Sequence, residues 1–210
     1  LMCANGCGKS TLFQLLTKNL EPSLGNIYLN NVDISQIPIK EFAQNVAIVH
    51  QYNTAPDDLT VYQLVSYGRT PYKKVFYNNL EKDIDTQEII RAMKMTGIYK
   101  FCNRTIHSLS GGQKQRVWIA MALAQDTKIL LLDEPTTYLD VRYQLQILRL
   151  VKDLNRQLGI TVLMVLHDIN QALTYSDEII ALSSNGELLV KGNPNEVIVP
   201  EIIKEMYGVS

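Results

Sequence analysis

The residues with the clearest chemical potential lie near the start of the sequence, where Gly8-Lys9-Ser10-Thr11 leads into a segment with helical apolar periodicity. This order is typical of a phosphate-binding loop. Backbone N–H groups in a glycine-rich turn point at anionic oxygens, and the helix that follows adds the positive end of its dipole. The Lys9 ammonium would reach the β- and γ-phosphates of a nucleotide, and the Ser10 hydroxyl would bind Mg²⁺. Matches of four residues also arise by chance, so other parts of such a site must be found elsewhere.

Three apolar runs that predict buried strands each end on residues able to do chemistry. The runs span 45–51, 128–134 and 159–168 and are rich in leucine and β-branched residues. Continuous runs of this kind, separated by helical patterns, indicate a parallel sheet covered on both faces. The polar residues near their carboxyl ends are Gln51, Asp133, Glu134 and His167. Because ligands bind outside the carboxyl ends of parallel strands, we expect them to converge with the phosphate loop, whose own strand would end at Leu1-Met2.

Two acidic residues follow the second apolar run. Asp133 stands at the strand end, where a carboxylate would complete the magnesium site, generally through water. Glu134 comes next and would polarise the water that attacks the terminal phosphate. The alternative for Glu134 is an ordinary solvated acid, but its position beside Asp133 favours the catalytic interpretation.

A second candidate anion site lies at Ser110-Gly111-Gly112, directly before an amphipathic helix. A serine cap followed by two glycines exposes backbone N–H groups at the positive end of that helix. The alternative is a glycine turn before a core helix, with Trp118, Ile119 and Leu123 packed inward, and the two interpretations are compatible. One bound nucleotide has a single triphosphate, which would not easily use both anion sites of the same chain. We therefore expect a head-to-tail pair, in which each phosphate loop holds ATP and the Ser110 segment of the partner copy closes over it.

Helical patterns and turn signals organise the rest of the chain. Apolar positions recur every three or four residues through 141–158, and Gly159 ends the expected helix. Antiparallel hairpins are expected around Asn30-Asn31 and around Asn185-Gly186, the second with a favoured two-residue turn. Residues 60–108 carry helical patterns and no convincing strand, which indicates a helical insertion.

Composition and charge exclude several function classes. The formal net charge of −1 gives no global positive field, so no nucleic-acid partner is expected. Cys3, Cys7 and Cys102 form an odd set without paired spacing, which indicates a reducing compartment. No signal peptide opens the sequence, and the longest apolar runs fall far short of the roughly 20 residues that span a bilayer. We expect a cytoplasmic protein whose membrane role depends on a partner.

In their order and spacing, the motifs resemble those of an ATP-binding cassette (ABC) transporter ATPase over essentially the whole sequence. They are the phosphate loop NGCGKST, the glutamine loop at Gln51, the signature LSGGQ, the Walker B strand ILLLDE, the D-loop TYLD and the switch histidine in VLHD. The resemblance implies an α/β P-loop NTPase, with a RecA-like parallel sheet flanked by helices and an inserted helical subdomain. It implies a single domain, with a nucleotide-binding core at 1–52 and 126–210 and a helical and signature subdomain at 53–125.

The resemblance also assigns roles to individual residues, with ATP and Mg²⁺ as the ligands. Nucleotide contacts are implied for Asn5, Gly6, Cys7, Gly8, Lys9, Ser10 and Thr11, for Ser110, Gly111, Gly112 and Gln113, and for Asp140 at the dimer seam. The implied Mg²⁺ ligands are Ser10, Gln51 and Asp133. The implied catalytic residues are Glu134 as general base, His167 as γ-phosphate contact, and Gln51 as Mg²⁺ sensor coupled to the membrane subunit.

Finer features at 59–72, 118–127, 133–140 and 165–172 resemble ATPases of ferric siderophore importers, with those of haem and cobalamin importers as close relatives. Such an ATPase lies at the cytoplasmic face of the cell membrane as a peripheral subunit and pairs with a second copy. It docks on permease subunits, which receive cargo from an extracytoplasmic substrate-binding protein. Candidates for the permease contact are Tyr52, Tyr67, Tyr72, Phe76 and Tyr77, with the core of the helical lobe as the alternative for each. The competing function is a non-hydrolytic module that only binds nucleotide or dimerises.

The sequence departs from the family pattern in two places. Cys3 replaces the first glycine of the phosphate loop, where a Cβ would cost about 1–3 kcal/mol if φ is positive. Cys3 is also a candidate oxidation site, with a tolerated small residue as the alternative. The antiparallel strands and the adenine-stacking aromatic residue that precede the loop in the family are largely missing, so we expect a fragment or a truncated product.

Overall fold

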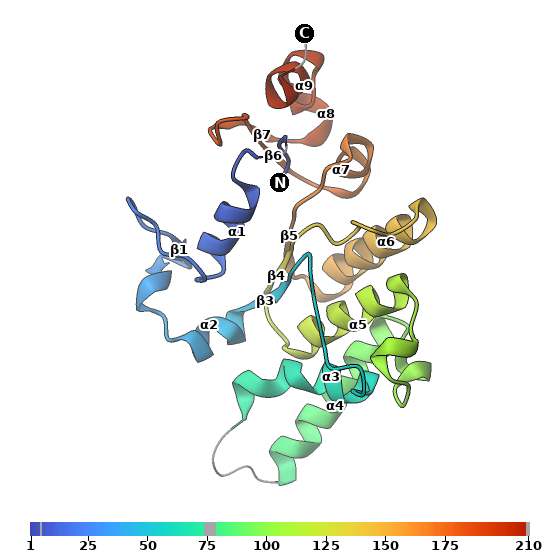
Figure 1. Ribbon diagram of the computed structural model, residues 1–210. Coiled ribbons are helices and arrows are strands. Elements are labelled where there is room, and N and C mark those ends of the chain that lie inside the picture. Colours follow the sequence, from blue (N-terminus) through green and yellow to red (C-terminus); the bar gives the residue numbers. More distant parts are fainter. Residues whose placement is uncertain (5, 74–78, 209–210) are drawn as a thin grey trace. The chain divides into compact units, whose positions relative to one another are not determined.

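The computed structural model describes residues 1–4, 6–73 and 79–208 (Figure 1). Three residues with an expected role, Asn5, Phe76 and Tyr77, lie outside the described residues. None of the helices in the described ranges has the length and apolar character needed to cross a membrane.

The chain divides into two compact units. The first combines Leu1–Gln36 with Leu163–Ser210, and the second is Ile37–Val162. Each unit has its own core and contains part of the predicted site. The division into a nucleotide-binding core and a helical subdomain stays a prediction.

In the first unit, Leu1 and Met2 make the backbone hydrogen bonds of a short strand. Met2 forms a parallel bridge with Ala181 of β6 (Ile179–Leu182). The Leu1 carbonyl accepts a hydrogen bond from the Leu166 amide at 3.1 Å. These two residues therefore supply the expected strand end that leads into the phosphate loop.

The first unit also contains helices and two hairpins. Its elements in chain order are α1 (Lys9–Leu16), β1 (Tyr28–Leu29), β2 (Val32–Asp33), the 3-10 helix η1 (Ile34–Gln36), α7 (Ile169–Tyr175), β6, β7 (Leu188–Gly192), α8 (Pro194–Val197) and α9 (Pro200–Tyr207). The first expected hairpin is confirmed, because β1 and β2 pair antiparallel. Its turn residues Asn30 and Asn31 have φ of 50° and 65°, a left-handed conformation that asparagine tolerates better than most residues.

The second expected hairpin is present, but its turn differs from the prediction. β6 and β7 pair antiparallel, and the Ser183 amide donates to the Glu187 carbonyl at 2.8 Å. The loop is therefore the three residues 184–186 rather than a two-residue turn. Gly186 has a φ of +81°, the left-handed conformation in which three-residue hairpin loops commonly end. An Asn-Gly pair suits both turn types, and the strand register decides between them.

A sheet with the strand order β3-β4-β5 begins in the second unit, and the end of β5 belongs to the first unit. β3 (Val46–Val49) pairs in parallel with β4 (Ile129–Leu132), and β5 (Thr161–Met164) begins in this unit on the other side of β4. All three predicted strands are confirmed, although each is shorter than the run that predicted it. The β3 and β4 side chains are mostly buried, which explains their continuous apolar pattern.

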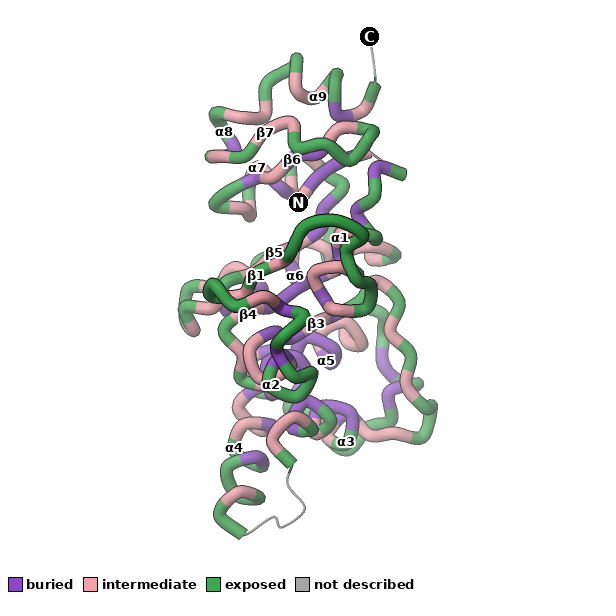
Figure 2. Tube along the Cα trace, turned by 90° about the vertical axis from the view of Figure 1, so that its left-hand side faces the viewer, coloured by how far each residue is buried: buried purple, intermediate pink, exposed green. Residues whose placement is uncertain are grey.

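Helices make up most of the remainder of the second unit. They are α2 (Ile39–Asn45), α3 (Val61–Ser66), the 3-10 helix η2 (Tyr67–Tyr72), α4 (Asn79–Met95), the 3-10 helices η3 (Tyr99–Phe101) and η4 (Ile106–Ser108), α5 (Gly111–Ala124) and α6 (Val141–Leu158). α6 has the predicted bounds, and Gly159 ends it with a φ of 64°. α5 is buried along much of its length, as the purple stretches in Figure 2 show. Its buried residues include Trp118, Ile119 and Leu123. The described residues between 60 and 108 are mainly helical, as expected.

A buried ion pair connects the helices of this region. Arg69 Nε donates to Asp85 Oδ1 at 2.6 Å, and both residues are almost fully buried. The same guanidinium donates to the Ala124 carbonyl at 2.9 Å and lies 3.9 Å from the centre of the Tyr72 ring. The Tyr72 hydroxyl donates to the Gln125 carbonyl at 2.9 Å. These contacts support the core alternative for Tyr72 over a permease contact.

Candidate functional site

The phosphate loop lies in the first unit, between Met2 and α1. Gly6 and Gly8 have φ of +84° and +97°, values that glycine adopts without strain. The Gly8 carbonyl accepts from the Leu12 amide at 2.8 Å, which closes the first turn of α1. The backbone N–H groups of that turn have no partners within the helix, so the loop and the helix start have the donors that a phosphate group requires.

The Lys9 side chain folds back onto the loop. Its ammonium donates to the Ala4 carbonyl at 2.8 Å and to the Cys3 carbonyl at 3.3 Å, and the residue is almost fully buried. Ser10 and Thr11 are exposed in the first turn of α1. Phosphate oxygens form stronger, charge-assisted hydrogen bonds than carbonyls do, so a triphosphate would compete well for this ammonium.

Two of the three cysteines are paired in the structure. Cys3 and Cys7 form a disulfide with their Cα atoms 6.4 Å apart, and among the described residues Cys102 is a free cysteine. This corrects the expectation of unpaired cysteines for Cys3 and Cys7. The two cysteines share a buried cluster with Leu182, a proximity that sequence spacing does not reveal. Cys3 does not have a positive φ, so the backbone strain considered for this position is not found.

In the second unit, Gln51 and Glu134 meet at the carboxyl ends of β3 and β4. Gln51 Nε2 donates to Glu134 Oε2 at 2.6 Å, and the Thr137 hydroxyl donates to the same oxygen at 3.0 Å. The parallel register explains this meeting: Val49 lies opposite Leu132, and each polar residue follows two positions later. The expected convergence of strand ends is confirmed for this pair of strands.

The backbone around Glu134 is unusual. Glu134 has a φ of +47°, which is uncommon for a residue other than glycine. Directly before it, the Asp133 amide donates to the Val49 carbonyl at 2.9 Å and extends the sheet ladder by one residue. Strained backbone of this kind persists where surrounding contacts hold it, and it is concentrated at functional sites.

The signature segment starts α5 with a capping box. The Gln113 amide donates to Ser110 Oγ at 3.4 Å, and the Ser110 amide donates to Gln113 Oε1 at 3.0 Å. Ser110 and Gly111 are exposed, whereas Gly112 is buried where a Cβ would lie 2.9 Å from the Tyr143 ring. The segment therefore begins a core helix, as the second interpretation predicts. Anion binding at its exposed residues stays a prediction, which the positive end of the helix favours.

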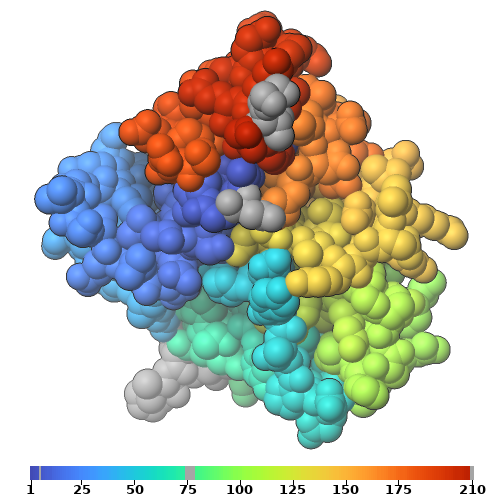
Figure 3. Space-filling view, turned by 45° about the horizontal axis from the view of Figure 1, so that its top comes forward, coloured from blue at the N-terminus to red at the C-terminus, as the bar shows by residue number. Residues whose placement is uncertain are grey.

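The D-loop contacts the segment that follows Gln51. The Tyr138 hydroxyl lies 2.6 Å from the Tyr52 hydroxyl, and this hydrogen bond raises the pKa of Tyr52. Both rings are exposed, and the chain around 51–58 runs along the surface (cyan in Figure 3). Asp140 accepts from the Tyr143 amide at 3.1 Å and caps α6.

His167 follows β5 in the first unit. Its carbonyl accepts from the Tyr207 hydroxyl of α9 at 3.2 Å, and burial raises the pKa of Tyr207. Asp168 caps α7 by accepting from the Gln171 amide at 3.0 Å. Contacts from α7 and α9 therefore hold the backbone at the His167 carbonyl and at Asp168.

The predicted Mg²⁺ ligands belong to different units. Ser10 lies in the first unit, and Gln51 and Asp133 lie in the second, so their joint binding of Mg²⁺ stays a prediction. Across the ranges that the structure describes, no three His, Cys, Asp or Glu side chains gather as a metal site. The predicted site does not need such a cluster, because Mg²⁺ in nucleotide sites keeps waters and binds phosphate oxygens with few protein ligands.

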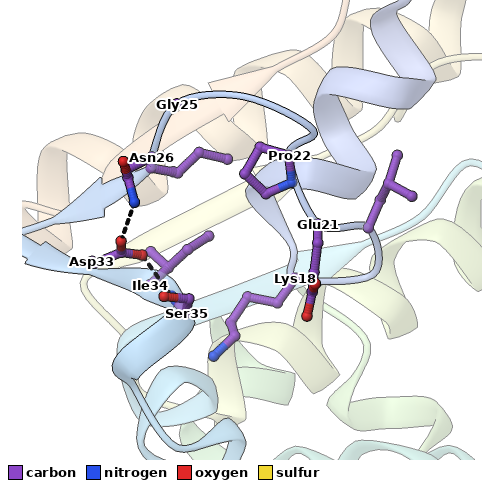
Figure 4. A pocket seen from close by; sticks show the side chains of 10 residues that line it. Lys18, Glu21, Pro22, Gly25, Asn26, Asp33, Ile34 and Ser35 are labelled. Atoms are coloured by element: carbon purple, nitrogen blue, oxygen red, sulfur yellow. Dashed lines mark hydrogen bonds between the residues drawn. The ribbon is translucent and has the colours of Figure 1, made fainter.

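A pocket of about 430 Å³ lies beyond the C-terminal end of α1 (Figure 4). Asp33 lines it and accepts from the Asn26 side chain at 2.6 Å and from the Ser35 amide at 2.9 Å. Hydrogen bonds from Ser35 and Asn26 lower the pKa of Asp33. A helix has its negative dipole end here, so this pocket does not have the electrostatics of the phosphate site.

Two residues that touch the candidate site were not singled out from the sequence. Thr137 begins the D-loop motif three positions after Glu134, and its amide also donates to the Glu134 carbonyl at 3.2 Å. Nothing in the motif indicates this contact. Tyr207 is forty residues from His167, and no local pattern indicates their contact.

Known proteins resemble this chain over its whole length. Residues 1–137 match the family model described as ABC transporter. The chain is 45 % identical to the iron(3+)-hydroxamate import ATP-binding protein FhuC of Bacillus subtilis (strain 168), covering 100 % of this chain and 77 % of that protein. It is 42 % identical to the ferric enterobactin transport ATP-binding protein FepC of Escherichia coli (strain K12), covering 98 % of this chain and 74 % of that protein.

Solved structures share the fold. One, described as an inward-facing conformation of a metal-chelate type ABC transporter, matches with a TM-score of 0.81 at 28 % identity over 98 % of this chain and 75 % of that chain. A dimeric structure of MJ0796, a bacterial ABC transporter cassette, matches with a TM-score of 0.74 at 30 % identity over 91 % and 82 %. The fold and the loop define an α/β P-loop nucleotide-binding protein. The chain belongs to the ABC transporter family, whose ATP-binding members are ATPases coupled to transport.

Proposed function

We propose that this chain is the ATP-hydrolysing subunit of an importer that takes up ferric siderophores through a partner permease. The cargo class rests on identity over nearly the whole chain to two relatives named for iron(3+)-hydroxamate and ferric enterobactin transport. The hydrolytic role rests on the Glu134 carboxylate, which two hydrogen bonds hold at the carboxyl end of β4.

ATP binding would begin at the phosphate loop. Lys9 would exchange the Cys3 and Ala4 carbonyls for β- and γ-phosphate oxygens, while N–H groups around Gly6 and Gly8 bind the remaining oxygens. The full set of loop contacts is Asn5, Gly6, Cys7, Gly8, Lys9, Ser10 and Thr11. Mg²⁺, held by Ser10, Gln51 and Asp133, would neutralise charge on the phosphates.

Hydrolysis would follow attack by a water molecule on the γ-phosphate. Glu134 would accept the proton of that water, and donors from Gln51 and Thr137 on its Oε2 fix the direction of the carboxylate. His167 would contact the γ-phosphate, with its backbone held by Tyr207.

The active assembly would be a head-to-tail dimer on a permease. Ser110, Gly111, Gly112 and Gln113 of one copy would cap the nucleotide bound by the other, with Asp140 at the seam. The nucleotide-binding core would be 1–52 with 126–210, and 53–125 the helical subdomain. The assembly would lie at the cytoplasmic face of the membrane and receive cargo from an extracytoplasmic binding protein. The exposed Tyr52 and Tyr67 are candidates for the permease contact.

Nucleotide assays test the enzymatic part of this proposal. The purified protein should hydrolyse ATP, Lys9→Ala should lose nucleotide binding, and Glu134→Gln should bind ATP without turnover. ATP binding without hydrolysis by the unsubstituted protein would instead indicate the non-hydrolytic module and overturn the proposal.

Uptake assays test the cargo. In cells that depend on this chain and its permease, labelled ferric siderophore should accumulate, and Lys9→Ala should abolish the accumulation. Uptake of haem or cobalamin in place of the siderophore would refute the assigned cargo while leaving the ATPase role intact.

A further inference from the structure

We propose that Cys3 and Cys7 are a redox modification site that controls the nucleotide loop: oxidation links them and weakens ATP binding, and reduction restores it. The proposal rests on the proposed ATP site. It gives the departure from glycine at Cys3 a function, and it involves two sulfur atoms to which the proposed ATPase chemistry assigns no role.

The fold holds the two thiols where they can pair. Their Cα atoms are 6.4 Å apart, within the range of roughly 4.4–6.8 Å that disulfides span. Both residues are almost fully buried and share an apolar cluster with Leu182, Leu12 and Ile180. Because both residues pack in this cluster, we expect their sulfurs to stay close together after reduction.

The linkage acts on the carbonyls that hold Lys9. The Cys3 and Ala4 carbonyls both accept hydrogen bonds from the Lys9 ammonium, and Ala4 lies inside the ring that the disulfide closes. A triphosphate must take the ammonium from these carbonyls, and the loop must adjust as it does so. A covalent link between positions 3 and 7 restrains that adjustment and keeps the carbonyls beside Lys9.

A peroxide is the oxidant class that fits this site. One thiolate attacks a peroxide oxygen to give a sulfenic acid and release water, and the second sulfur then displaces water to form the S–S bond. Two electrons pass from the cysteines to the peroxide, and a dithiol reverses the reaction by exchange. Gly6 and Gly8, on either side of Cys7, are exposed, so a small oxidant has a short path to the sulfur.

The test combines peptide mapping with nucleotide binding on the full chain. After treatment with hydrogen peroxide, mass spectrometry should find a Cys3–Cys7 linked peptide that dithiothreitol removes. The apparent Kd of a fluorescent ATP analogue should be about tenfold weaker in the oxidised protein, the scale of one or two net hydrogen bonds at the ammonium. Dithiothreitol should restore it.

Two variants separate this effect from general oxidation. Cys3→Gly should bind the analogue equally well under both conditions, because it cannot form the link. Cys102→Ser should bind as the unsubstituted protein does when reduced and should retain the full redox response. A response that persists in Cys3→Gly, a linked protein that binds with unchanged Kd, or no linked peptide would each overturn the proposal. If reduced Cys3→Gly and the reduced unsubstituted protein both fail to bind nucleotide, the proposed ATP site itself is wrong.

Discussion

Two side-chain contacts and an unusual backbone conformation position Glu134. Gln51 comes from the end of the neighbouring strand, Thr137 comes from the turn that follows, and the backbone takes an uncommon positive φ. The sequence predicted Glu134 and Gln51 because both follow buried strands whose register is set by parallel pairing. It did not single out Thr137, because a threonine in a turn carries no distinctive pattern.

The hydroxyl of Thr137 provides the first prediction. Thr137→Val keeps the shape of the side chain and removes the donor to Glu134, so kcat for ATP should fall about fivefold, the equivalent of roughly 1 kcal/mol, while KM changes little. Steady-state ATPase assays measure both constants. Thr136→Val, the matched change at the preceding residue, should leave kcat near the unsubstituted value. Equal losses in the two variants would contradict the positioning role of Thr137.

At the scale of elements, the close approach of α5 and α6 depends on one glycine. A Cβ at Gly112 would meet the Tyr143 ring at 2.9 Å, whereas a Cβ at Gly111 would lie 3.4 Å from the mobile end of the Leu139 side chain. The signature motif therefore has a packing role inside one copy, in addition to any role at a nucleotide.

The two signature glycines should respond in opposite ways to alanine. Gly112→Ala overpacks the helix contact and should lower the free energy of unfolding by about 1–3 kcal/mol. Gly111→Ala gains helix propensity at an exposed position, so its stability should be unchanged or higher by up to about 1 kcal/mol. Urea unfolding distinguishes these outcomes. Comparable stability of the two variants would show that Tyr143 does not limit the approach of the helices.

The β6–β7 turn packs against the phosphate loop through another glycine. Gly186 has a φ of +81°, and a Cβ there would lie 2.8 Å from the Cys7 carbonyl oxygen. Gly25 has a similar φ of +78°, but has nothing within 4 Å of a Cβ. An alanine at Gly25 would cost only the strain of a positive φ, whereas an alanine at Gly186 would also clash with the Cys7 carbonyl. Comparing the two substitutions therefore separates these two free-energy costs.

We expect Gly25→Ala to lower the free energy of unfolding by about 1 kcal/mol and to leave ATP binding unchanged, since only the backbone conformation is strained. Gly186→Ala should cost more and should weaken ATP binding, because the Cys7 carbonyl must move. Thermal unfolding and nucleotide titration give the two readouts. Normal ATP affinity in Gly186→Ala would show that the turn does not support the loop.

For the whole molecule, the sequence predicts the regular elements better than the contacts between distant segments. The three buried strands and the 141–158 helix follow from apolar periodicity, and the structure has them all. The Cys3–Cys7 pairing depends on loop curvature, and the three-residue β6–β7 loop depends on strand register. The hydrogen bond between Tyr207 and His167 depends on where the last helix docks. No local pattern encodes these three features.

The proposed ATP site requires two copies of the chain, because it places Lys9 from one copy opposite the Ser110 segment of the other. Mixing two inactive variants tests this directly. Lys9→Ala removes the phosphate-binding ammonium, and Gly111→Asp places a carboxylate where the γ-phosphate would bind. Aspartate in the first turn of α5 suits the helix dipole, so the second variant should fold.

Each variant alone should have almost no ATPase activity, since both sites of its dimer carry the same defect. In a mixed dimer, Lys9 of the Gly111→Asp copy faces the intact signature of the Lys9→Ala copy, which leaves one complete site. The measurement is the ATPase rate of an equimolar mixture, and we predict a rate well above that of either variant. A mixture no more active than its components would contradict a site shared between two copies.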